Sequence, residues 1–305
     1  MPEAVPTSLS EVIDAYLADC VRRGLRPTTL RGYGADLGIL ARHLGGPAVL
    51  ADLTLRTARD AVDVLGQRRQ AGSVAGFVRV LRTFSTWCVD EGLLASDPLA
   101  RLKAPRVDRK TIDVPTDHEI AAMTRTADPL GRLVIAILTG TGMRVGELCA
   151  LDLDDVRPDC LVIRSAKARE GRVVPLDPAL RAELDTWLRF GRPQPLPLHA
   201  RALLVTRTKR RASPDVIRHA LRRISARAGI EGISIHPHLF RHWFARDLVA
   251  HDTPTLVIAA RGGWKTLSVL QRYAVVGPNE VRRDVERYSP AERLAAMDGA
   301  RSGGP

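Results

Sequence analysis

The sequence lacks the segments that would place a chain in or across a membrane. Its 305 residues contain no apolar run of 18 or more, and the first residues, MPEAVPTSLSEV, have neither the basic start nor the apolar core of a secretory signal. Cysteine is also scarce, because Cys20, Cys88, Cys149 and Cys160 are scattered and form no CxxC pair. We therefore expect a cytoplasmic protein with no membrane partner, whose reduced cysteines pack in its cores.

Lysine is scarce too, and the distribution of basic charge is informative. Five of the 46 basic residues are Lys and 41 are Arg. Residues 1–100 carry 11 Lys and Arg against 11 Asp and Glu, whereas residues 101–305 carry 35 against 23 and so hold all of the +12 net charge. Codon bias explains the preference for Arg, but it does not explain why the excess is confined to one segment. A basic domain beside a neutral one is typical of a protein that binds nucleic acid.

The first hundred residues have the pattern of a small helical bundle. Ser8-Leu9-Ser10-Glu11 reads as a capping box, and the apolar residues after it recur at helical spacing until Gly24. Further helices are predicted over 28–44, after Thr54, and over about 72–91. Four helices with short connections predict an independent domain over 1–100.

A basic, proline-containing stretch without periodicity follows the bundle. Residues 101–115 are predicted to form an interdomain linker, and Thr116-Asp117-His118-Glu119 reads as a second capping box that starts the next domain. In that domain the β-rich runs CLVIRS and RVVPL flank AKAREG and predict a hairpin, while helical patterns dominate afterwards to about residue 297. We expect a mainly α fold with a small β-hairpin (α+β), a second domain over 116–298 and a disordered tail over 299–305.

The stretch HPHLFRHWFA, residues 236–245, holds three histidines and an arginine. His238 and His242 have the i,i+4 spacing of a zinc-binding HExxH helix, but leucine stands where that motif has glutamate, so a metal site is disfavoured. The proline before His238 suits the first turn of a helix, which puts His238 near the positive end of the helix dipole and Arg241 one turn later on the same face. This pattern fits a grip on phosphate and an ordinary packed helix equally well, with His236 expected in the preceding loop and His242 packed within the fold.

A second arginine stands in TGTGMRVGELCAL, residues 139–151. Two glycines free the backbone before Arg144, and Glu147 follows at i+3, where its carboxylate can orient the guanidinium. A solvated ion pair with no further role accounts for the same spacing locally.

Tyrosine is rare, which narrows the choice of a nucleophile. Of the four tyrosines, Tyr16 and Tyr33 fall on inward faces of the N-terminal helices, so Tyr273 and Tyr288 remain in the basic domain. Trp264 stands nine residues before Tyr273 in RGGWKTLSVLQRY.

With these residues in order, the sequence resembles the tyrosine recombinases, or phage integrase family, over nearly its whole length. TGMRVGEL looks like the family's first box, HPHLFRHWFA like its second, and the stretch through Tyr273 like the motif that holds the nucleophile. KAREGRVVPL resembles the β-turn that carries a lysine, here Lys167, and the N-terminal bundle is similar to the SAM-like core-binding domain. Each box alone is weak, but five in the right order form a strong signal.

The resemblance implies a role for each matching residue. Arg144 and Arg241 would hold the nonbridging oxygens of a scissile phosphate, Tyr273 would attack the phosphorus, and Glu147 would support the site from behind. Two guanidinium groups stabilise the more negative transition state better than the ground state, and a phosphotyrosine stores the energy of the broken bond for rejoining. Neither metal nor ATP is therefore implied as a cofactor.

The resemblance also implies which residues carry out the proton transfers. Lys167 would be the general acid for the leaving 5′ oxygen, because a lysine can release a proton and a guanidinium cannot; a solvated hairpin lysine is the alternative. His238 would assist. Trp264 stands where most members have His and some have Trp, and an indole N–H donates a hydrogen bond without exchanging protons. We therefore expect His238 and Lys167 to carry more of the acid–base work.

The implied function is site-specific DNA recombination, by a two-domain clamp of the simpler, Xer-like architecture. Its partners would be a double-stranded DNA recombination site and further copies of the chain, four protomers on two sites. The segment 278–297 could dock on a neighbouring copy or pack as an amphipathic helix on its own domain. Two other functions stay open: a topoisomerase IB-like nicking and closing enzyme, and a DNA-binding regulator with a decayed active site.

Overall fold

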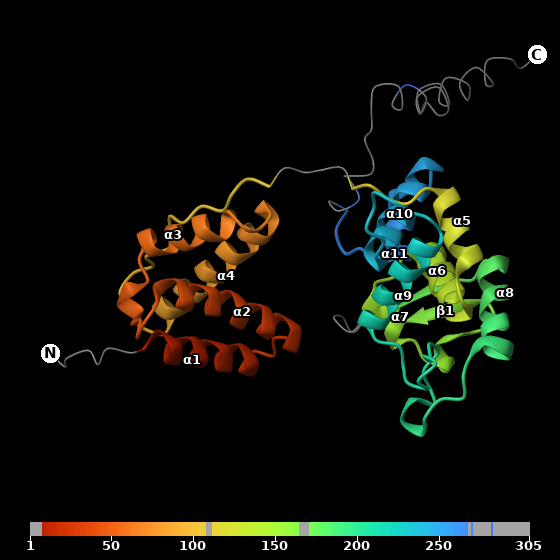
Figure 1. Ribbon diagram of the computed structural model, residues 1–305, viewed down its shortest axis with the longest axis horizontal. Coiled ribbons are helices and arrows are strands. Elements are labelled where there is room, and N and C mark those ends of the chain that lie inside the picture. The colour runs from red at the N-terminus through yellow and green to blue at the C-terminus, as the bar shows by residue number, and fades with distance from the viewer. Residues whose placement is uncertain (1–7, 108–111, 165–170, 268–269, 271–281, 283–305) are drawn as a thin grey trace, which may run out of the picture. The chain divides into compact units, whose positions relative to one another are not determined.

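The computed structural model (Figure 1) describes residues 8–107, 112–164, 171–267, 270 and 282. The chain divides into two compact units, Met1–Lys110 and Thr111–Pro305. The division falls inside the stretch expected to be a linker. The described ends of that stretch belong to the two cores, because Leu102 is buried in the first unit and Ile112 packs against the second. The tail 299–305 lies outside the described residues.

The N-terminal unit is a helical bundle, as predicted. Its helices are α1 (Leu9–Arg22), α2 (Pro27–Leu44), α3 (Leu55–Gly66) and α4 (Ala71–Asp90), with a short 3₁₀ turn, η1 (Leu50–Asp52). The ring of Tyr16 is fully buried at the centre and packs against Phe84 and Trp87, with ring centroids 5.4 and 5.2 Å away. The inward position predicted for Tyr16 is therefore confirmed.

The two expected capping boxes have different outcomes. Thr116 caps its helix as predicted: its hydroxyl accepts from the Glu119 amide at 3.2 Å, and its own amide donates to the Glu119 carboxylate at 2.7 Å. Ser8 is the N-cap of α1, but its hydroxyl contacts Ser10 at 2.7 Å, so the box with Glu11 is wrong. The start of α1 is held by tertiary structure instead, since the Leu9 amide donates to the Ala48 carbonyl at 2.9 Å.

The C-terminal unit is mainly helical with one antiparallel hairpin, which confirms the predicted fold class. The hairpin pairs β1 (Cys160–Ile163) with β2 (Arg172–Pro175), in a register that sets Ile163 opposite Arg172. The helices are α5 (Asp117–Thr126), α6 (Pro129–Thr141), α7 (Val145–Ala150), α8 (Pro178–Thr186), α9 (Pro214–Arg227), α10 (Pro237–Ala250) and α11 (Thr255–Gly262). Short turns complete the unit: η2 (Leu153–Asp155), the π turn η3 (Trp187–Gly191) and η4 (Pro197–His199).

Helix α6 is the centre of this unit (Figure 1). Its apolar run is fully buried and packs against α5, α8, α9 and α10. Asp128 caps its start by accepting from the Gly131 amide at 2.8 Å, and Gly142 ends it in the left-handed conformation, φ +58°. Because α6 also packs on α10, the turn after Gly142 comes to lie beside the first turns of α10. No helix in the described part of the chain is both long and apolar enough to cross a membrane.

Candidate active site

Two of the predicted arginines meet at the end of α6, in different environments. Arg144 follows the α6 turn as the N-cap of α7, and its side chain is 52% exposed. Arg241 comes from α10, nearly a hundred residues later, and is only 2% exposed. The packing of α6 on α10 brings the two groups together, and the charge of Arg144 lowers the pKa of Arg241.

Backbone carbonyls hold the guanidinium of Arg241. Its Nη1 donates to the carbonyls of Gly142, at 2.6 Å, and Gly262, at 2.5 Å. Its Nη2 is also buried, yet has no hydrogen-bond partner among the described residues. Burial and, to a lesser extent, the positive charge of Arg144 lower the pKa of Arg241 to about 9, so the group stays charged at neutral pH. A buried cation with an unused donor is stabilised by an anion that supplies the missing acceptor.

Glu147 orients Arg144, as the i,i+3 spacing predicted. Its Oε1 accepts from Arg144 Nη1 at 3.0 Å, and its Oε2 accepts from the Arg144 amide at 3.1 Å. The Glu147 side chain is only 10% exposed, whereas that of Arg144 is 52% exposed, so solvent reaches this ion pair from the Arg144 side. Arg144 also points both terminal nitrogens at the Gly263 carbonyl over a longer 3.4 Å.

Sequence reasoning missed Arg172, which shares Glu147 with Arg144. Arg172 Nη2 donates to Glu147 Oε2 at 2.9 Å, and Arg172 Nε donates to the Arg261 carbonyl at 2.8 Å. Burial alone would raise the pKa of Glu147, but the hydrogen bonds from Arg172 and Arg144 outweigh it, so the pKa is lowered and the carboxylate stays ionised. The alternation of β2 was the available signal, because it sets Arg172 on the same face as buried Val174.

Three glycines supply the carbonyls that hold both arginines: Gly142, Gly262 and Gly263. A Cβ on Gly142 would lie 2.3 Å from the Phe244 ring, and one on Gly262 would lie 1.9 Å from Trp264. Gly263 has φ +67°, which also disfavours a side chain. A side chain is therefore disfavoured at each of the three positions. The sequence predicted a need for glycine only before Arg144, and the structure shows the same need at Gly262.

Trp264 covers Arg241 with its ring face. The Arg241 Cζ lies 3.8 Å from the centroid of the Trp264 ring, a cation–π contact, and the Phe244 ring also stacks on Trp264 with ring centroids 6.4 Å apart. The sequence argument considered only the indole N–H as a donor. In the structure, the face of the Trp264 ring contacts the Arg241 guanidinium and helps to hold it in place.

The three histidines of HPHLFRHWFA differ in their exposure to solvent. His236 is the extended N-cap residue of α10, half-buried, and burial together with the charge of Arg218 lowers its pKa. His242 is buried. His238 is exposed on the first turn of α10, with its ring 4.4 Å from that of His242 in an edge-to-face contact.

Two predicted site residues, Lys167 and Tyr273, lie outside the described residues. Their flanks are described: Lys167 stands in sequence between β1 and β2, whose pairing confirms the predicted hairpin. Leu270, three residues before Tyr273, is fully buried in a small core with Ala245 and Ile258. The structure therefore brings together Arg144, Glu147, Arg241 and Trp264.

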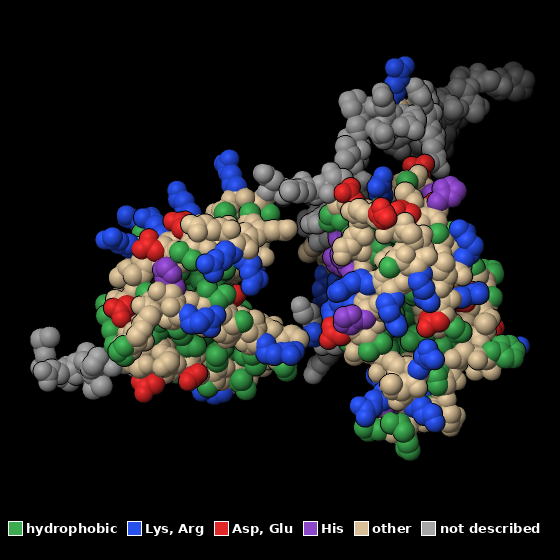
Figure 2. Space-filling model, viewed as in Figure 1, with side chains coloured by type: hydrophobic (Ala, Val, Ile, Leu, Met, Phe, Trp, Pro, Cys, Tyr) green, Lys and Arg blue, Asp and Glu red, His purple; other side chains and the backbone are tan. Residues whose placement is uncertain are grey.

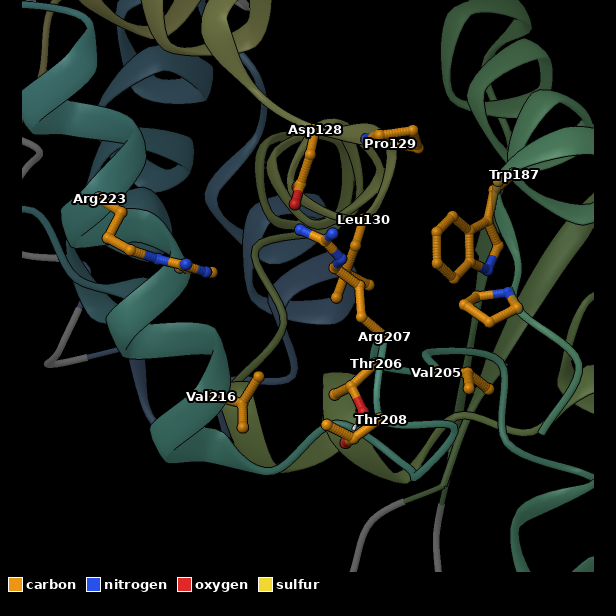
Figure 3. Close-up of a pocket in the computed structure, with 13 residues that line it drawn as sticks. Asp128, Pro129, Leu130, Trp187, Val205, Thr206, Arg207, Thr208, Val216 and Arg223 are labelled. Carbon is orange, nitrogen blue, oxygen red and sulfur yellow. Dashed lines mark hydrogen bonds between the residues drawn. The ribbon is translucent and has the colours of Figure 1, made fainter. Parts of the chain in front are cut away.

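A cavity of about 510 Å³ lies elsewhere in the same unit and is separate from this cluster. Figure 3 shows Arg223 of α9 on one side of it and Trp187 on the other, and none of the predicted site residues lines it. The arginine cluster is instead open to solvent on the Arg144 side. Figure 2 shows Lys and Arg side chains spread over the visible face of each unit, the N-terminal one included, although residues 1–100 carry no net charge.

Comparison with known proteins agrees with this arrangement. The model of the phage integrase family matches residues 116–280. The chain is 32% identical to tyrosine recombinase XerC of Mycobacterium sp. (strain JLS), over 93% of this chain and 99% of that protein, and 28% identical to tyrosine recombinase XerD of Staphylococcus aureus, over 74% and 79%.

Solved structures share the fold at low sequence identity. The Tn1549 transposon integrase in complex with circular intermediate DNA superposes with a TM-score of 0.75 at 14% identity, covering 92% of this chain and 99% of that one. The lambda integrase of a tetramer bound to a Holliday junction superposes with a TM-score of 0.74 at 18% identity, covering 89% and 78%. The family model spans more than half of the chain and the Mycobacterium relative nearly all of it, and the chain therefore belongs to the phage integrase family, the tyrosine recombinases.

Proposed function

We propose that this protein is a site-specific DNA recombinase that cleaves and rejoins DNA through a 3′-phosphotyrosyl intermediate, without metal or ATP. The observation that carries the proposal is the buried guanidinium of Arg241, whose Nη2 has no acceptor among the described residues, next to the exposed guanidinium of Arg144. A phosphodiester group supplies nonbridging oxygens to both.

The electrostatics of the cluster suit a transition state better than a ground state. Charge on the nonbridging oxygens grows as the nucleophile approaches phosphorus, and donors already fixed in place stabilise it without reorganisation. Arg241 is fixed by two carbonyls and the Trp264 ring, and Arg144 is fixed by Glu147. The single negative charge of Glu147 cannot neutralise the two positive charges of Arg144 and Arg241. The cluster therefore keeps the positive charge that binds a phosphate.

The chemical steps fall to Tyr273 and Lys167. The Tyr273 oxygen attacks phosphorus as its hydroxyl loses a proton; the P–O5′ bond breaks, and Lys167 gives a proton to the departing 5′ oxygen. His238, on the first turn of α10, assists by taking up the proton that the Tyr273 hydroxyl loses. In the reverse step a 5′ hydroxyl attacks the phosphotyrosine, releases Tyr273 and restores the DNA backbone, so no external energy source is required.

The proposed partners are a double-stranded recombination site and further copies of the chain, as a tetramer on two sites. The fold similarity to an integrase in complex with circular intermediate DNA, and to one solved as a tetramer on a Holliday junction, supports this assembly. The basic excess of residues 101–305 supports a polyanionic partner. Such an enzyme acts at the nucleoid, in the cytoplasm.

Trapping the covalent intermediate tests the proposal. Duplexes that the wild-type protein selects from a randomised library are made with a nick near the cleavage point, so that the cut fragment diffuses away. The wild type is expected to form a protein–DNA adduct, Tyr273→Phe to form none, and the matched control Tyr288→Phe to form as much as the wild type. An adduct that survives in Tyr273→Phe and disappears in Tyr288→Phe would reverse the assignment of the nucleophile.

A second assay separates recombination from the topoisomerase alternative. A supercoiled plasmid with two selected sites in direct repeat is expected to give two smaller circles. Relaxation of the plasmid without resolution, equally on plasmids with and without the sites, would favour a nicking and closing enzyme.

A further inference from the structure

Arg172 connects three elements around the arginine cluster. It is the first residue of β2, it donates to Glu147 of α7, and it donates to the carbonyl of Arg261 near the end of α11. Its side chain is 14% exposed, far less than that of Arg144. An arginine with this burial is committed to protein contacts and leaves little surface for DNA.

Two arginine side chains hold the carboxylate of Glu147. Oε1 accepts from Arg144 and Oε2 accepts from Arg172, so neither oxygen can turn away without breaking a charge-assisted hydrogen bond. The other acceptor of Arg144, the Gly263 carbonyl, is 3.4 Å from its nitrogens and directs it weakly. The direction of Arg144 therefore depends on Glu147, whose Oε2 is held by Arg172 at 2.9 Å together with the Arg144 amide at 3.1 Å.

The same side chain ties the hairpin to the glycine turn. Arg172 pairs with Ile163 at the end of the described ladder, next to the segment that contains Lys167 in the sequence. The space where a Cβ of Gly263 would lie is 2.7 Å from Arg172 Nη1, so the turn that holds Arg144 and Arg241 packs directly on Arg172. Displacing Arg172 would loosen β2 and this turn together.

We propose that Arg172 is a positioning residue: through Glu147 it fixes the direction of Arg144, and through the Arg261 carbonyl it locks β2 to the end of α11. The proposal rests on the proposed function, because Arg144 is taken to bind the scissile phosphate. Arg172 touches no reacting atom and acts only through its neighbours.

Single-turnover cleavage of the selected nicked duplexes, measured beside their affinity, tests this role. Arg172→Met is expected to slow adduct formation by about 10- to 100-fold, the usual range for loss of a group that orients a site residue, and to change the DNA Kd by less than about threefold. Arg172→Lys keeps one donor for Glu147 but not the second for Arg261, and is expected to fall in between.

Arg181→Met is the matched control. Arg181 also donates to one carboxylate, that of Asp185, and to one backbone carbonyl, that of Arg157, but on α8, away from the cluster. We expect its cleavage rate to stay within about threefold of the wild type, even if its melting temperature falls as much as that of Arg172→Met. Equal slowing by both variants would reduce Arg172 to a stabilising residue and overturn the proposal.

A double-mutant cycle with Glu147→Gln distinguishes positioning from general damage. Because part of the effect of Arg172 passes through Glu147 and the rest through the Arg261 carbonyl, adding Arg172→Met to Glu147→Gln is expected to cost clearly less than Arg172→Met costs in the wild type, whereas independent effects multiply. Full multiplication, or an Arg172→Met variant that cleaves like the wild type, contradicts the proposal. If Arg172→Met does not fold, Arg172→Lys takes its place in the cycle. A wild type that forms no adduct on any selected duplex refutes the proposed function instead.

Discussion

At the scale of single residues, the two arginines of the cluster divide their work by environment. Arg241 is buried and held by carbonyls and an aromatic ring, so its position is set before any ligand arrives. Arg144 is half exposed and held by one carboxylate, so it can meet a phosphate from the solvent side. A preorganised donor costs no reorganisation during the reaction, which makes Arg241 the more demanding position to replace.

Arg241→Lys is expected to lower the single-turnover cleavage rate by about 100-fold or more, the loss found when one transition-state donor is removed. An ammonium group cannot donate to the Gly142 and Gly262 carbonyls and still present a planar fork to phosphate. Arg246→Lys, an exposed arginine one turn later on α10, is the control and should cleave within about threefold of the wild type. Comparable rates for the two variants would contradict the role of Arg241.

Trp264→Phe is expected to cost less than about tenfold in cleavage, since phenylalanine keeps an aromatic face over Arg241 and a cation–π contact contributes about 1 to 2 kcal/mol. Trp264→Ala removes that face and should cost more. Lys167→Ala, measured in the same assay, should cost more than Trp264→Phe, because it removes the proposed general acid. A greater loss for Trp264→Phe than for Lys167→Ala would show that the indole N–H does essential work.

At the scale of elements, turns rather than helices build the cluster. The carbonyls that hold the arginines come from the turn after α6 and the turn after α11, and both turns depend on the absence of side chains. The starts of two helices are held in different ways. The Thr116 hydroxyl accepts from an amide of its own helix, whereas the first amide of α1 donates to the carbonyl of Ala48.

Gly262→Ala is expected to lower the free energy of unfolding by about 1 to 3 kcal/mol, because the new methyl group overlaps the Trp264 ring and forces it to move. Gly146→Ala, in the helix α7 of the same unit, meets nothing within 4 Å and should leave stability unchanged or slightly higher. Chemical denaturation followed by tryptophan fluorescence measures both. Equal stability of the two variants would mean that the turn has room to relax.

The capping difference is also measurable. Thr116→Ala is expected to cost about 1 kcal/mol of stability, because it leaves the Glu119 amide without its acceptor. Ser8→Ala should cost no more than a few tenths of a kcal/mol, since its hydroxyl caps no amide of α1. Urea titration of both variants provides the comparison, and a larger loss for Ser8→Ala would restore the capping box that the sequence suggested.

The sequence anticipated most of the elements and part of the site, for local reasons. The hairpin, the helices of the N-terminal unit and the Arg144–Glu147 contact arise from alternation, helical periodicity and i,i+3 spacing, which are all visible over a few residues. Arg172 and the Gly262 turn were missed because their contacts join residues 25 and 21 positions apart or more. The Ser8 capping box failed for a local reason, since the Ser8 hydroxyl bonds the Ser10 hydroxyl and caps no amide of α1.

At the scale of the whole molecule, basic charge is distributed unequally along the chain. Residues 101–305 hold all of the +12 excess, while the N-terminal segment balances its charges but exposes Arg31, Arg68, Arg79 and Arg82, among others. A neutral total over residues 1–100 does not prevent their arginines from contacting phosphates, and long-range attraction to DNA falls mainly to residues 101–305.

DNA affinity of the full chain is therefore expected to fall steeply with salt, by roughly 10³-fold or more between about 50 and 200 mM for six or more phosphate contacts. Fluorescence anisotropy with a labelled selected duplex measures the slope. A chain that begins at residue 112 should keep most of the dependence of DNA affinity on salt, but should lose its preference for the selected DNA sequence. A flat salt dependence of the full chain would contradict a phosphate-dominated interface.

The glycine carbonyls have an evolutionary consequence as well. An acceptor that belongs to the main chain cannot be deleted by changing a side chain, so the anchoring of Arg241 is insensitive to drift at most surrounding positions. The vulnerability concentrates instead at Gly142, Gly262 and Gly263, where any side chain meets Phe244, Trp264 or Arg172. Active variants of this enzyme should therefore tolerate many substitutions around the cluster but almost none at these three glycines.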